Sequence, residues 1–390
     1  MSTNLRLLRN PLVALAPAED GYLAYDASHD RLHRLNAAAA LIIELCDGTR
    51  TAAAILADVA PFVAGDAGAG CTRWIDGALE DGLLETIEPD ASVAATPAPE
   101  YFSKLASRLR SKGSVRAAFV CQHYATMQTP DDPEQWAALG DIAHIVGRRE
   151  DAREAYERYL ELSPGDAEVE HILVALRDAP PPPRAPDECV VQLYERFAEF
   201  YERNMRGDLE YCGPELIAAA LDRTFGSPDA TLDVLELGCG TGLVGKPLRA
   251  RARRLVGIDL SPDMVKRAKA TKRYDALEVA EITEWLSRSA DREFDLIAAG
   301  DTFIYFGDLR QVLKPAAARL RAGGRVVFTV ERDEGSGFRL TDSGRYVHTE
   351  AHIHDAARDA GLVVEIMDSA VLRYEYGEAV QALVVVLRAA

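Results

Sequence analysis

The stretch Leu232–Leu243 constrains the fold more than any other part of the chain, because an apolar run ends abruptly in closely spaced glycines. Apolar side chains alternate with acids, and Gly238, Gly240 and Gly242 then follow at every second position. Glycine readily takes the positive φ angles that tight turns need, and it lets a ligand approach the backbone. A helical pattern resumes at Val244. The stretch therefore predicts a strand, a tight turn and the start of a helix.

A second apolar run, Leu255–Ile258, ends in Asp259. An acid about twenty residues beyond such a turn accepts hydrogen bonds from the hydroxyls of a ribose. A dinucleotide site has the turn Gly-x-Gly-x-x-Gly, whereas an S-adenosylmethionine site prefers an acid followed by Gly-x-Gly-x-Gly. The chain has the second pattern, from Glu236 to Gly242. From about Val191 to its end it resembles class I S-adenosylmethionine-dependent methyltransferases.

This resemblance implies an α/β, Rossmann-like sheet of seven strands whose last strand is antiparallel. Further strand-like runs are Asp275–Ala280, Phe294–Gly300, Gly323–Val330, Leu362–Ile366 and Ala379–Leu387. It also implies S-adenosylmethionine as methyl donor, S-adenosylhomocysteine as product and a set of cofactor contacts. These are Glu236, Gly238, Gly240, Gly242, Asp259, Leu260, Met264, Glu281, Ile282 and Asp301.

Polar residues after the predicted fourth and fifth strands are candidates for catalysis, because ligands of open α/β sheets lie beyond the carboxyl ends of the strands. Methyl transfer needs an aligned acceptor and, for some acceptors, removal of a proton. We expect the catalytic residues to be Asp301, Tyr305, Arg345 and His348. His348 fits either a base or a loop histidine. Arg345 fits either a clamp on a substrate carboxylate or an ion pair with Asp342.

An aromatic-rich amphipathic pattern, residues 191–201, precedes the first strand. Phe197 and Phe200 fit either the core or, as in methyltransferases with a similar opening, a lid over the cofactor. The segments Asp301–Asp308 and Ser343–His348 resemble a bacterial group of methyltransferases that carry tetratricopeptide repeats on the N-terminal side. This likeness implies fold and cofactor but no substrate.

Residues 1–88 predict a small winged helix-turn-helix (α+β) domain. Three β-like runs are followed by helices capped by Asn36 and Thr51, and a turn at Asp47–Gly48 separates these helices. The runs are Leu12–Leu15, Gly21–Tyr25 and Arg31–Leu35, and the helices are 37–46, 52–59 and a third near 74–80, before a short strand at Leu83–Leu84. The second helix has no Arg, Lys, Asn or Gln, and the chain carries a formal charge of -18. Both features argue against a nucleic-acid partner.

The run Arg34–Thr51 resembles the D-type peptide chaperone of pyrroloquinoline quinone biosynthesis. Relatives of that chaperone are recognition elements fused to enzymes that modify ribosomally made peptides. The resemblance implies that a leader peptide adds as a strand to the edge of the three-stranded sheet.

Residues 99–178 predict an all-α region of tetratricopeptide repeats. Trp136, Leu139, Gly140, Ala152, Tyr156 and Pro164 have the spacing of one repeat, and a degenerate unit precedes them. We expect Glu168–Leu176 to cap the stack. The repeats either present a concave face to a peptide or protein, or act as a spacer or homodimer contact. The proline-rich segment Asp178–Pro186 predicts an extended linker, so that the methyltransferase domain covers 187–390.

Composition indicates a cytoplasmic protein with no membrane segment, because no apolar run is long enough to span a bilayer. The six cysteines form no C-x-x-C pair, and His348 and His352 lack an implied third ligand, so we expect no metal site. Three hypotheses follow: a methyltransferase acting on a peptide or protein, a small-molecule methyltransferase with structural N-terminal domains, and a non-catalytic scaffold.

Overall fold

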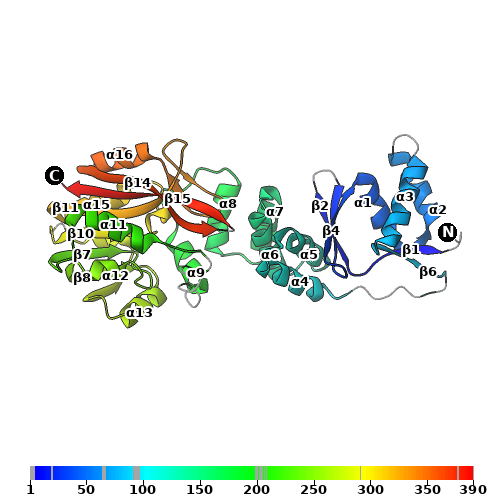
Figure 1. Cartoon of the computed structure of the whole chain (residues 1–390), viewed down its shortest axis with the longest axis horizontal. Helices are drawn as coiled ribbons and strands as arrows, with labels where there is room; N and C mark the ends of the chain where they lie inside the picture. The colour runs from blue at the N-terminus through cyan, green and yellow to red at the C-terminus, as the bar shows by residue number, and fades with distance from the viewer. Residues whose placement is uncertain are drawn as a thin grey trace. The chain divides into compact units, whose positions relative to one another are not determined.

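The computed structural model describes residues 5–18, 21–63, 67–89, 91, 97–197, 201, 205, 207, 209–289, 291–375 and 377–389. The chain forms two compact units, Met1–Pro164 and Gly165–Ala390 (Figure 1). The break between them comes before the proline-rich segment that the sequence favours as the clearest boundary. Among the described residues, none of the helices has the length and apolar character needed to cross a bilayer.

The first unit begins with two small antiparallel sheets. One has the order β2-β3-β4, from strands β2 (Val13–Ala18), β3 (Gly21–Asp26) and β4 (Arg31–Asn36). The other has the order β5-β1-β6, from β1 (Arg6–Arg9), β5 (Asp47–Thr51) and β6 (Leu84–Ile87). The sequence indicated the first sheet and the strand near Leu84. It missed β1 and assigned Asp47–Gly48 to a turn, which is wrong because pairing with β1 makes this short polar run a strand.

Helices of the first part of this unit pack on the two sheets around one core. They are α1 (Ala37–Leu45), α2 (Ala52–Val59), η1 (Ala60–Phe62) and α3 (Ala67–Glu80). As expected, the Asn36 side chain accepts a hydrogen bond from the Ala39 N–H, and Thr51 accepts one from Ala54. Buried side chains from the helices meet strand residues such as Leu7 in the core. Whether this arrangement is a peptide-recognition domain stays a prediction.

Two antiparallel helix pairs complete the first unit, α4 (Pro99–Ser111) with α5 (Val115–Gln128), and α6 (Pro133–Ile145) with α7 (Arg149–Leu162). Gly140 allows the second pair to approach closely, because a Cβ there would lie 2.5 Å from the Tyr156 ring. Helix α5 packs against β2 and β3. An Arg148 Nη1 donates to the Pro17 carbonyl oxygen at 2.6 Å, so the helices and the β2-β3-β4 sheet form one body.

The second unit is built on a mixed sheet, which has nine strands in the described part of the chain. Seven of them have the order β9-β8-β7-β10-β11-β15-β14, with β15 antiparallel to β11 as expected. The hairpin β12-β13 pairs with the end of β11, so the expectation of seven strands was wrong. The sequence did not indicate β12 and β13, because strands of three residues are too short to show an alternating apolar pattern. The strands are β7 (Leu232–Leu237), β8 (Ala252–Asp259), β9 (Ala276–Val279), β10 (Phe294–Ala299), β11 (Leu320–Arg332), β12 (Phe338–Leu340), β13 (Tyr346–His348), β14 (Leu362–Glu375) and β15 (Glu378–Ala389).

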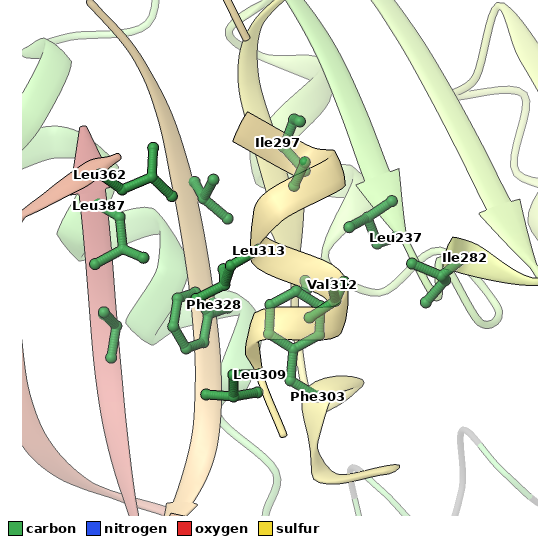
Figure 2. Close-up of a cluster of buried hydrophobic side chains, with 14 of the residues drawn as sticks. Leu237, Ile282, Ile297, Phe303, Leu309, Val312, Leu313, Phe328, Leu362 and Leu387 are labelled. Atoms are coloured by element: carbon green, nitrogen blue, oxygen red, sulfur yellow. The ribbon is translucent and has the colours of Figure 1, made fainter. Parts of the chain in front are cut away.

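Helices cover both faces of this sheet (Figure 1). On one face, α11 (Gly213–Phe225) and α12 (Gly245–Arg249) pack on β7 and β11. On the other, α14 (Ile282–Ser287), α15 (Arg310–Arg319) and α16 (Glu350–Asp359) bury a second apolar core. In this core, Leu309, Val312 and Leu313 lie beside Phe303 and Phe328 (Figure 2). Helix α13 (Pro262–Ala270) packs against β8 and β9, and the short η3 (Phe303–Tyr305) follows β10.

Helix α8 (Ala167–Leu176) forms where a helix was expected, but it belongs to the second unit and packs against α9 (Asp187–Phe197). Its His171 Nε2 lies 3.2 Å from the carbonyl oxygen of Gly344, in the same unit. The prediction that this helix caps the repeats is therefore not supported.

The proline-rich segment is also not a free linker. The Ala185 N–H donates to the Tyr305 carbonyl oxygen at 2.8 Å, and the Gly307 N–H donates to Pro183 at 2.9 Å. The Tyr346 hydroxyl donates to the Pro182 carbonyl oxygen at 2.7 Å. Proline lacks an N–H, but its carbonyl still accepts hydrogen bonds. Residues 182–186, here called the proline strap, are thus part of the second unit.

Candidate functional site

A cavity of about 650 Å³, partly open to solvent, lies at the carboxyl ends of the central parallel strands. Strand β7 has β8 on one side and β10 on the other, which is the switch point where open α/β sheets bind ligands. The lining residues are Arg184, Ala185, Val190, Tyr194, Tyr201, Gly238, Gly240, Asp259, Leu260, Glu281, Ile282, Gly300, Asp301, Thr302, Tyr305 and Phe306.

The glycine turn forms one wall of the cavity. Gly238, Gly240 and Gly242 have φ angles of 64°, 51° and 90°. A Cβ on Gly238 would lie 2.4 Å from the Thr302 side chain, whereas one on Gly240 would meet no heavy atom within 4 Å. Gly240 therefore leaves space into which a ligand can come close to the backbone. The buried Thr241 hydroxyl in this turn has no partner among the described residues, but Thr241 does not line the cavity.

Asp259 fixes the turn and faces the cavity. Its Oδ2 accepts a hydrogen bond from the Gly240 N–H at 2.8 Å, and its Oδ1 accepts one from the Ser261 N–H at 2.9 Å. Burial raises the pKa of this carboxyl. Each oxygen keeps a second lone pair. Asp259 can therefore accept hydrogen bonds from two ribose hydroxyls, as the fit of the cofactor requires.

Beyond Asp259 the cavity has an apolar side, made by Leu260 and Ile282. Glu281 also lines it, but its carboxylate already accepts hydrogen bonds from the Glu284 N–H and the Thr283 hydroxyl as the cap of α14. Leu260 and Ile282 can enclose an adenine, whereas the Glu281 side chain mainly caps α14.

Three expected cofactor contacts do not line the cavity. Glu236 is buried under the glycine turn and accepts a hydrogen bond from the Tyr274 hydroxyl at 2.8 Å. Burial raises the pKa of Glu236 to about 8. Gly242 lies against Tyr274, and Met264 is buried. Glu236 and Gly242 therefore support the turn from behind, and a direct contact of any of the three with the cofactor stays a prediction.

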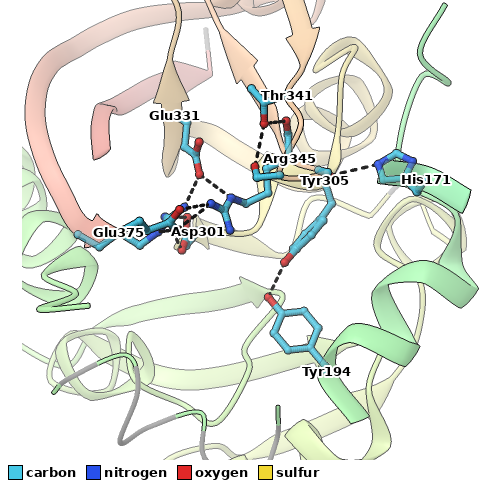
Figure 3. Close-up of polar contacts among 11 residues, drawn as sticks. His171, Tyr194, Asp301, Tyr305, Glu331, Thr341, Arg345 and Glu375 are labelled. Carbon is cyan, nitrogen blue, oxygen red and sulfur yellow. Dashed lines mark hydrogen bonds and ion pairs between the residues drawn. The ribbon is translucent and has the colours of Figure 1, made fainter. Parts of the chain in front are cut away.

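The opposite wall of the cavity contains Asp301, held by a network of charges (Figure 3). Asp301 has a φ of 55°, and its N–H donates to the Thr329 hydroxyl at 2.9 Å. Nη1 of Arg373, a side chain only 2% exposed, lies 3.0 Å from both Asp301 carboxylate oxygens. Arg373 also pairs with Glu331 and Glu375.

Arg345 belongs to the same network, because it pairs with Glu331 and Glu375 (Figure 3). Arg345 does not line the cavity, so the expectation that it clamps a substrate carboxylate is not met. Its guanidinium is paired with two carboxylates of the protein itself. The three carboxylates Asp301, Glu331 and Glu375 against two guanidiniums leave one formal negative charge in the network.

Tyrosines complete the wall near Asp301. The hydroxyl groups of Tyr194 and Tyr305 are 3.0 Å apart, and both rings line the cavity (Figure 3). Tyr201 lines it as well, with its ring centroid 5.9 Å from that of Tyr194. Burial raises the pKa of Tyr194 and Tyr305, so both phenols are neutral at pH 7. Tyr305 thus lies where it was expected, but as a hydrogen-bonding group rather than a base.

His348 does not reach the cavity. It is fully buried, and its Nε2 donates to the Phe306 carbonyl oxygen at 2.8 Å. Burial lowers its pKa to about 4. The neighbouring His352 Nε2 accepts a hydrogen bond from the Leu309 N–H at 3.3 Å. The interpretation of His348 as a catalytic base is wrong, because the ring holds the loop after η3 in place.

Several lining residues were not identified from the sequence. Tyr194 and Tyr201 lie in the run that predicts a lid, whereas the residues expected to form that lid are Phe197, which ends α9, and Phe200, which lies outside the described residues. Arg184 was hidden in the proline-rich segment. Arg373, which holds Asp301, does not line the cavity, and its only signal in the sequence is a charged residue between the apolar Leu372 and Tyr374.

Comparisons with known proteins agree with this geometry. Residues 235–326 match a family model described as a methyltransferase domain. The chain is 32% identical over 121 residues to malonyl-[acyl-carrier protein] O-methyltransferase of Hamiltonella defensa, which covers 31% of this chain and 46% of that protein. It is 31% identical over 108 residues to methyltransferase-like protein 27 of Homo sapiens, and this match covers 27% of this chain and 44% of that protein.

The second unit carries an S-adenosylmethionine-dependent methyltransferase domain. Among solved structures, magnesium protoporphyrin IX methyltransferase of Synechocystis PCC 6803 with bound SAH has a TM-score of 0.41 and 14% identity, covering 53% of this chain and 100% of that one. The chain spans between 32% and 46% of the length of the first curated relatives that it matches.

Proposed function

We propose that the chain methylates a peptide or protein, with the second unit performing the transfer and the first unit capturing the substrate. The proposal that the second unit transfers a methyl group rests above all on Asp259, whose buried carboxylate lines the cavity and accepts a hydrogen bond from the Gly240 N–H. Bound S-adenosylmethionine supplies an electrophilic methyl group in this cavity.

Residues at the ends of different strands contact different parts of the cofactor and the acceptor. Asp259 holds the ribose, and Leu260 and Ile282 enclose the adenine. The backbone of the Gly238–Gly240 turn faces the amino acid part. Asp301 and Tyr305 lie at the end of β10, where they face the acceptor. Excluding water and aligning the acceptor is the main contribution of these side chains, because in-line transfer depends chiefly on orientation.

Capture of the substrate is supported by the open edge of the β2-β3-β4 sheet. The β2 edge is covered, since Arg148 bonds to the Pro17 carbonyl oxygen and α5 packs on this strand. Strand β4 pairs with β3 alone among the described strands. It carries Leu32, which is 42% exposed, and basic residues but no acid. An extended, acidic segment such as a leader peptide can add to β4 as a further strand.

The experiment is a selection of peptides from a display library on the full chain, followed by a test of each for transfer of an isotopically labelled methyl group. Leu32→Asp should abolish capture, because it places a charge on the apolar site of the edge strand. The matched control is Val363→Asp on β14, since Val363 is 50% exposed on a strand of the other unit. Peptides that bind the Leu32→Asp variant as well as the wild type contradict capture at β4.

A small-molecule acceptor is the second candidate, and the proline strap favours it. Arg184 and Ala185 of the strap line the cavity beside Tyr194, which narrows the access of a large substrate. Two of the curated relatives are named ubiquinone biosynthesis O-methyltransferase and malonyl-[acyl-carrier protein] O-methyltransferase. If this candidate is right, the fragment Gly165–Ala390 keeps the full turnover of the whole chain.

A further inference from the structure

We propose that the acceptor side of the cavity recognises an amine, so that the methyl group is transferred to nitrogen. The inference rests on the proposed function, because it names the acceptor class of the same cavity. It is carried by the carboxylate of Asp301 and the rings of Tyr194, Tyr201 and Tyr305, which line the cavity together.

The strand order places Asp301 on the acceptor side, with Tyr305 in the η3 helix that follows. The ring of Tyr194 contacts this group through Tyr305, and the ring of Tyr201 contacts Tyr194. Asp259 and Glu281 follow β8 and β9, on one side of β7, whereas Asp301 follows β10 on the other side. A cofactor with its ribose on Asp259 and its adenine near Ile282 occupies the β8 and β9 side. The space next to Asp301 is left for the transferable methyl group and the acceptor.

The tyrosine rings surround this space as an aromatic cage does. The Tyr194 ring centroid is 5.9 Å from that of Tyr201 and 6.1 Å from that of Tyr305, with interplanar angles of 66° and 76°. Rings at steep angles present faces and edges to a group placed between them. Such cages bind ammonium groups when the cation lies within about 6 Å of a ring centroid.

The charge of the wall favours a cation in the same place. Asp301 belongs to the network whose three carboxylates exceed its two guanidiniums by one charge. A buried excess charge is costly unless a partner balances it. Among the described residues that line the cavity, Arg184 is the one cation, and it pairs with Asp187. A carboxylate acceptor would bring a further anion next to Asp301.

Nitrogen also suits the weak bases near the acceptor. A hydroxyl acceptor needs an effective base within reach at neutral pH, but both oxygens of the Asp301 carboxylate are held by Arg373, and the Tyr194 and Tyr305 phenols are neutral and hydrogen-bonded to one another. An amine that binds as an ammonium ion releases one proton to water, which leaves a lone pair on its neutral nitrogen. This nitrogen forms the new N–C bond with the pair as the S–C bond of the donor breaks and leaves its electrons on sulfur. The product is a methylated ammonium ion, and the Asp301 wall stabilises the positive charge on nitrogen as it develops.

The test compares choline with its uncharged isostere 3,3-dimethylbutan-1-ol in ligand-observed NMR titrations of the full chain saturated with S-adenosylhomocysteine. We expect choline to bind at least about 5-fold more tightly than the isostere. Tyr194→Leu should weaken choline binding about 2- to 30-fold, the range of one cation–π contact. Tyr194→Phe keeps the ring and should keep the affinity, and Asp301→Asn should lower it. Tyr101→Leu, an exposed tyrosine of α4, is the matched control.

Equal binding of choline and the isostere would overturn the proposal, and so would no binding of choline. Tighter binding of acetate than of choline would also overturn it and would indicate a carboxylate acceptor. S-adenosylhomocysteine binding is measured first. If the chain does not bind it, the proposed function fails, and the same titrations on the free chain still test the cage.

Discussion

The Gly240 N–H donates to Oδ2 of Asp259 at 2.8 Å, which ties the turn after β7 to the acid at the end of β8. The two residues are 19 positions apart in the chain. Since Asp259 also accepts from the Ser261 N–H, its carboxylate has one fixed orientation toward the cavity. The turn and the Asp259 carboxylate are thus one preorganised unit.

Substitutions of Gly240 and Gly238 should separate cofactor binding from folding. Gly240→Val adds bulk in the open space of the cavity, so the affinity for S-adenosylhomocysteine should fall by more than about 10-fold, while the φ of 51° adds about 1–2 kcal/mol of strain. Gly238→Ala places its Cβ 2.4 Å from Thr302, so it should lower the melting temperature more. Calorimetric titration and thermal unfolding measure the two effects. Unchanged affinity in Gly240→Val would show that no ligand approaches this turn.

Arg373 should be among the most sensitive positions for stability. Arg373→Met leaves Asp301, Glu331 and Glu375 with one guanidinium, and removal of one partner from a buried ion pair costs about 3–5 kcal/mol. The free energy of unfolding can be followed in urea through Trp285 of the second unit. Arg388→Met removes a partly exposed pair with Glu365 and should cost only about 0–1 kcal/mol. Similar losses in both variants would contradict the central role of Arg373.

His348 should make the second unit less stable in acid. Burial lowers its pKa to about 4 in the folded state, from 6.5 in the unfolded chain. Between these values the unfolded chain binds more protons, so stability is complete above about pH 6.5 and falls as the pH drops toward 4. The contribution is roughly 3 kcal/mol. His348→Asn should flatten this part of the profile of unfolding free energy against pH. A slope as steep as that of the wild type would show that His348 is not the group responsible.

The proline strap should be needed for the cofactor site, although the sequence indicates a linker. A fragment Gly165–Ala390 should bind S-adenosylhomocysteine like the whole chain. A fragment starting at Val191 lacks Arg184, Ala185 and Val190, which line the cavity, so its affinity should fall. Equal affinity of both fragments for S-adenosylhomocysteine would contradict the role of the strap.

With a peptide substrate, kcat/KM of the fragment Gly165–Ala390 should fall by about 10- to 1000-fold relative to the whole chain, because capture by the first unit is lost.

The parts of the fold that the sequence predicted are those with a strong local signal. The turn at Gly238–Gly242 shows itself through glycine chemistry, and the caps Asn36 and Thr51 through a side-chain oxygen before an apolar helix. The strands of the methyltransferase sheet are apolar runs because both of their faces are buried. Short polar strands such as β5 have no such pattern and form only because a distant strand pairs with them.

The errors at the site have a different cause, since they concern residues whose environment is set by distant parts of the chain. His348 has an ordinary sequence context, and only the Phe306 carbonyl oxygen and the surrounding burial make it a structural residue. The proline strap has the composition of a linker, but the backbone of Tyr305 and Gly307 binds it. Arg373 meets Asp301 from a strand 72 residues away.

The most direct test of the methyltransferase site asks whether Asp259 holds the ribose. Calorimetry gives the affinities of S-adenosylhomocysteine and its 2′,3′-dideoxy analogue for the wild type and for Asp259→Ala, with Asp263→Ala, an exposed acid of α13, as control. Hydrogen bonds to a charged group contribute about 1.5–3 kcal/mol, so the wild type should prefer the natural ribose by about 10-fold or more. Asp259→Ala should lose most of this preference, and Asp263→Ala should keep it. An unchanged preference in Asp259→Ala would contradict the assignment of this cavity.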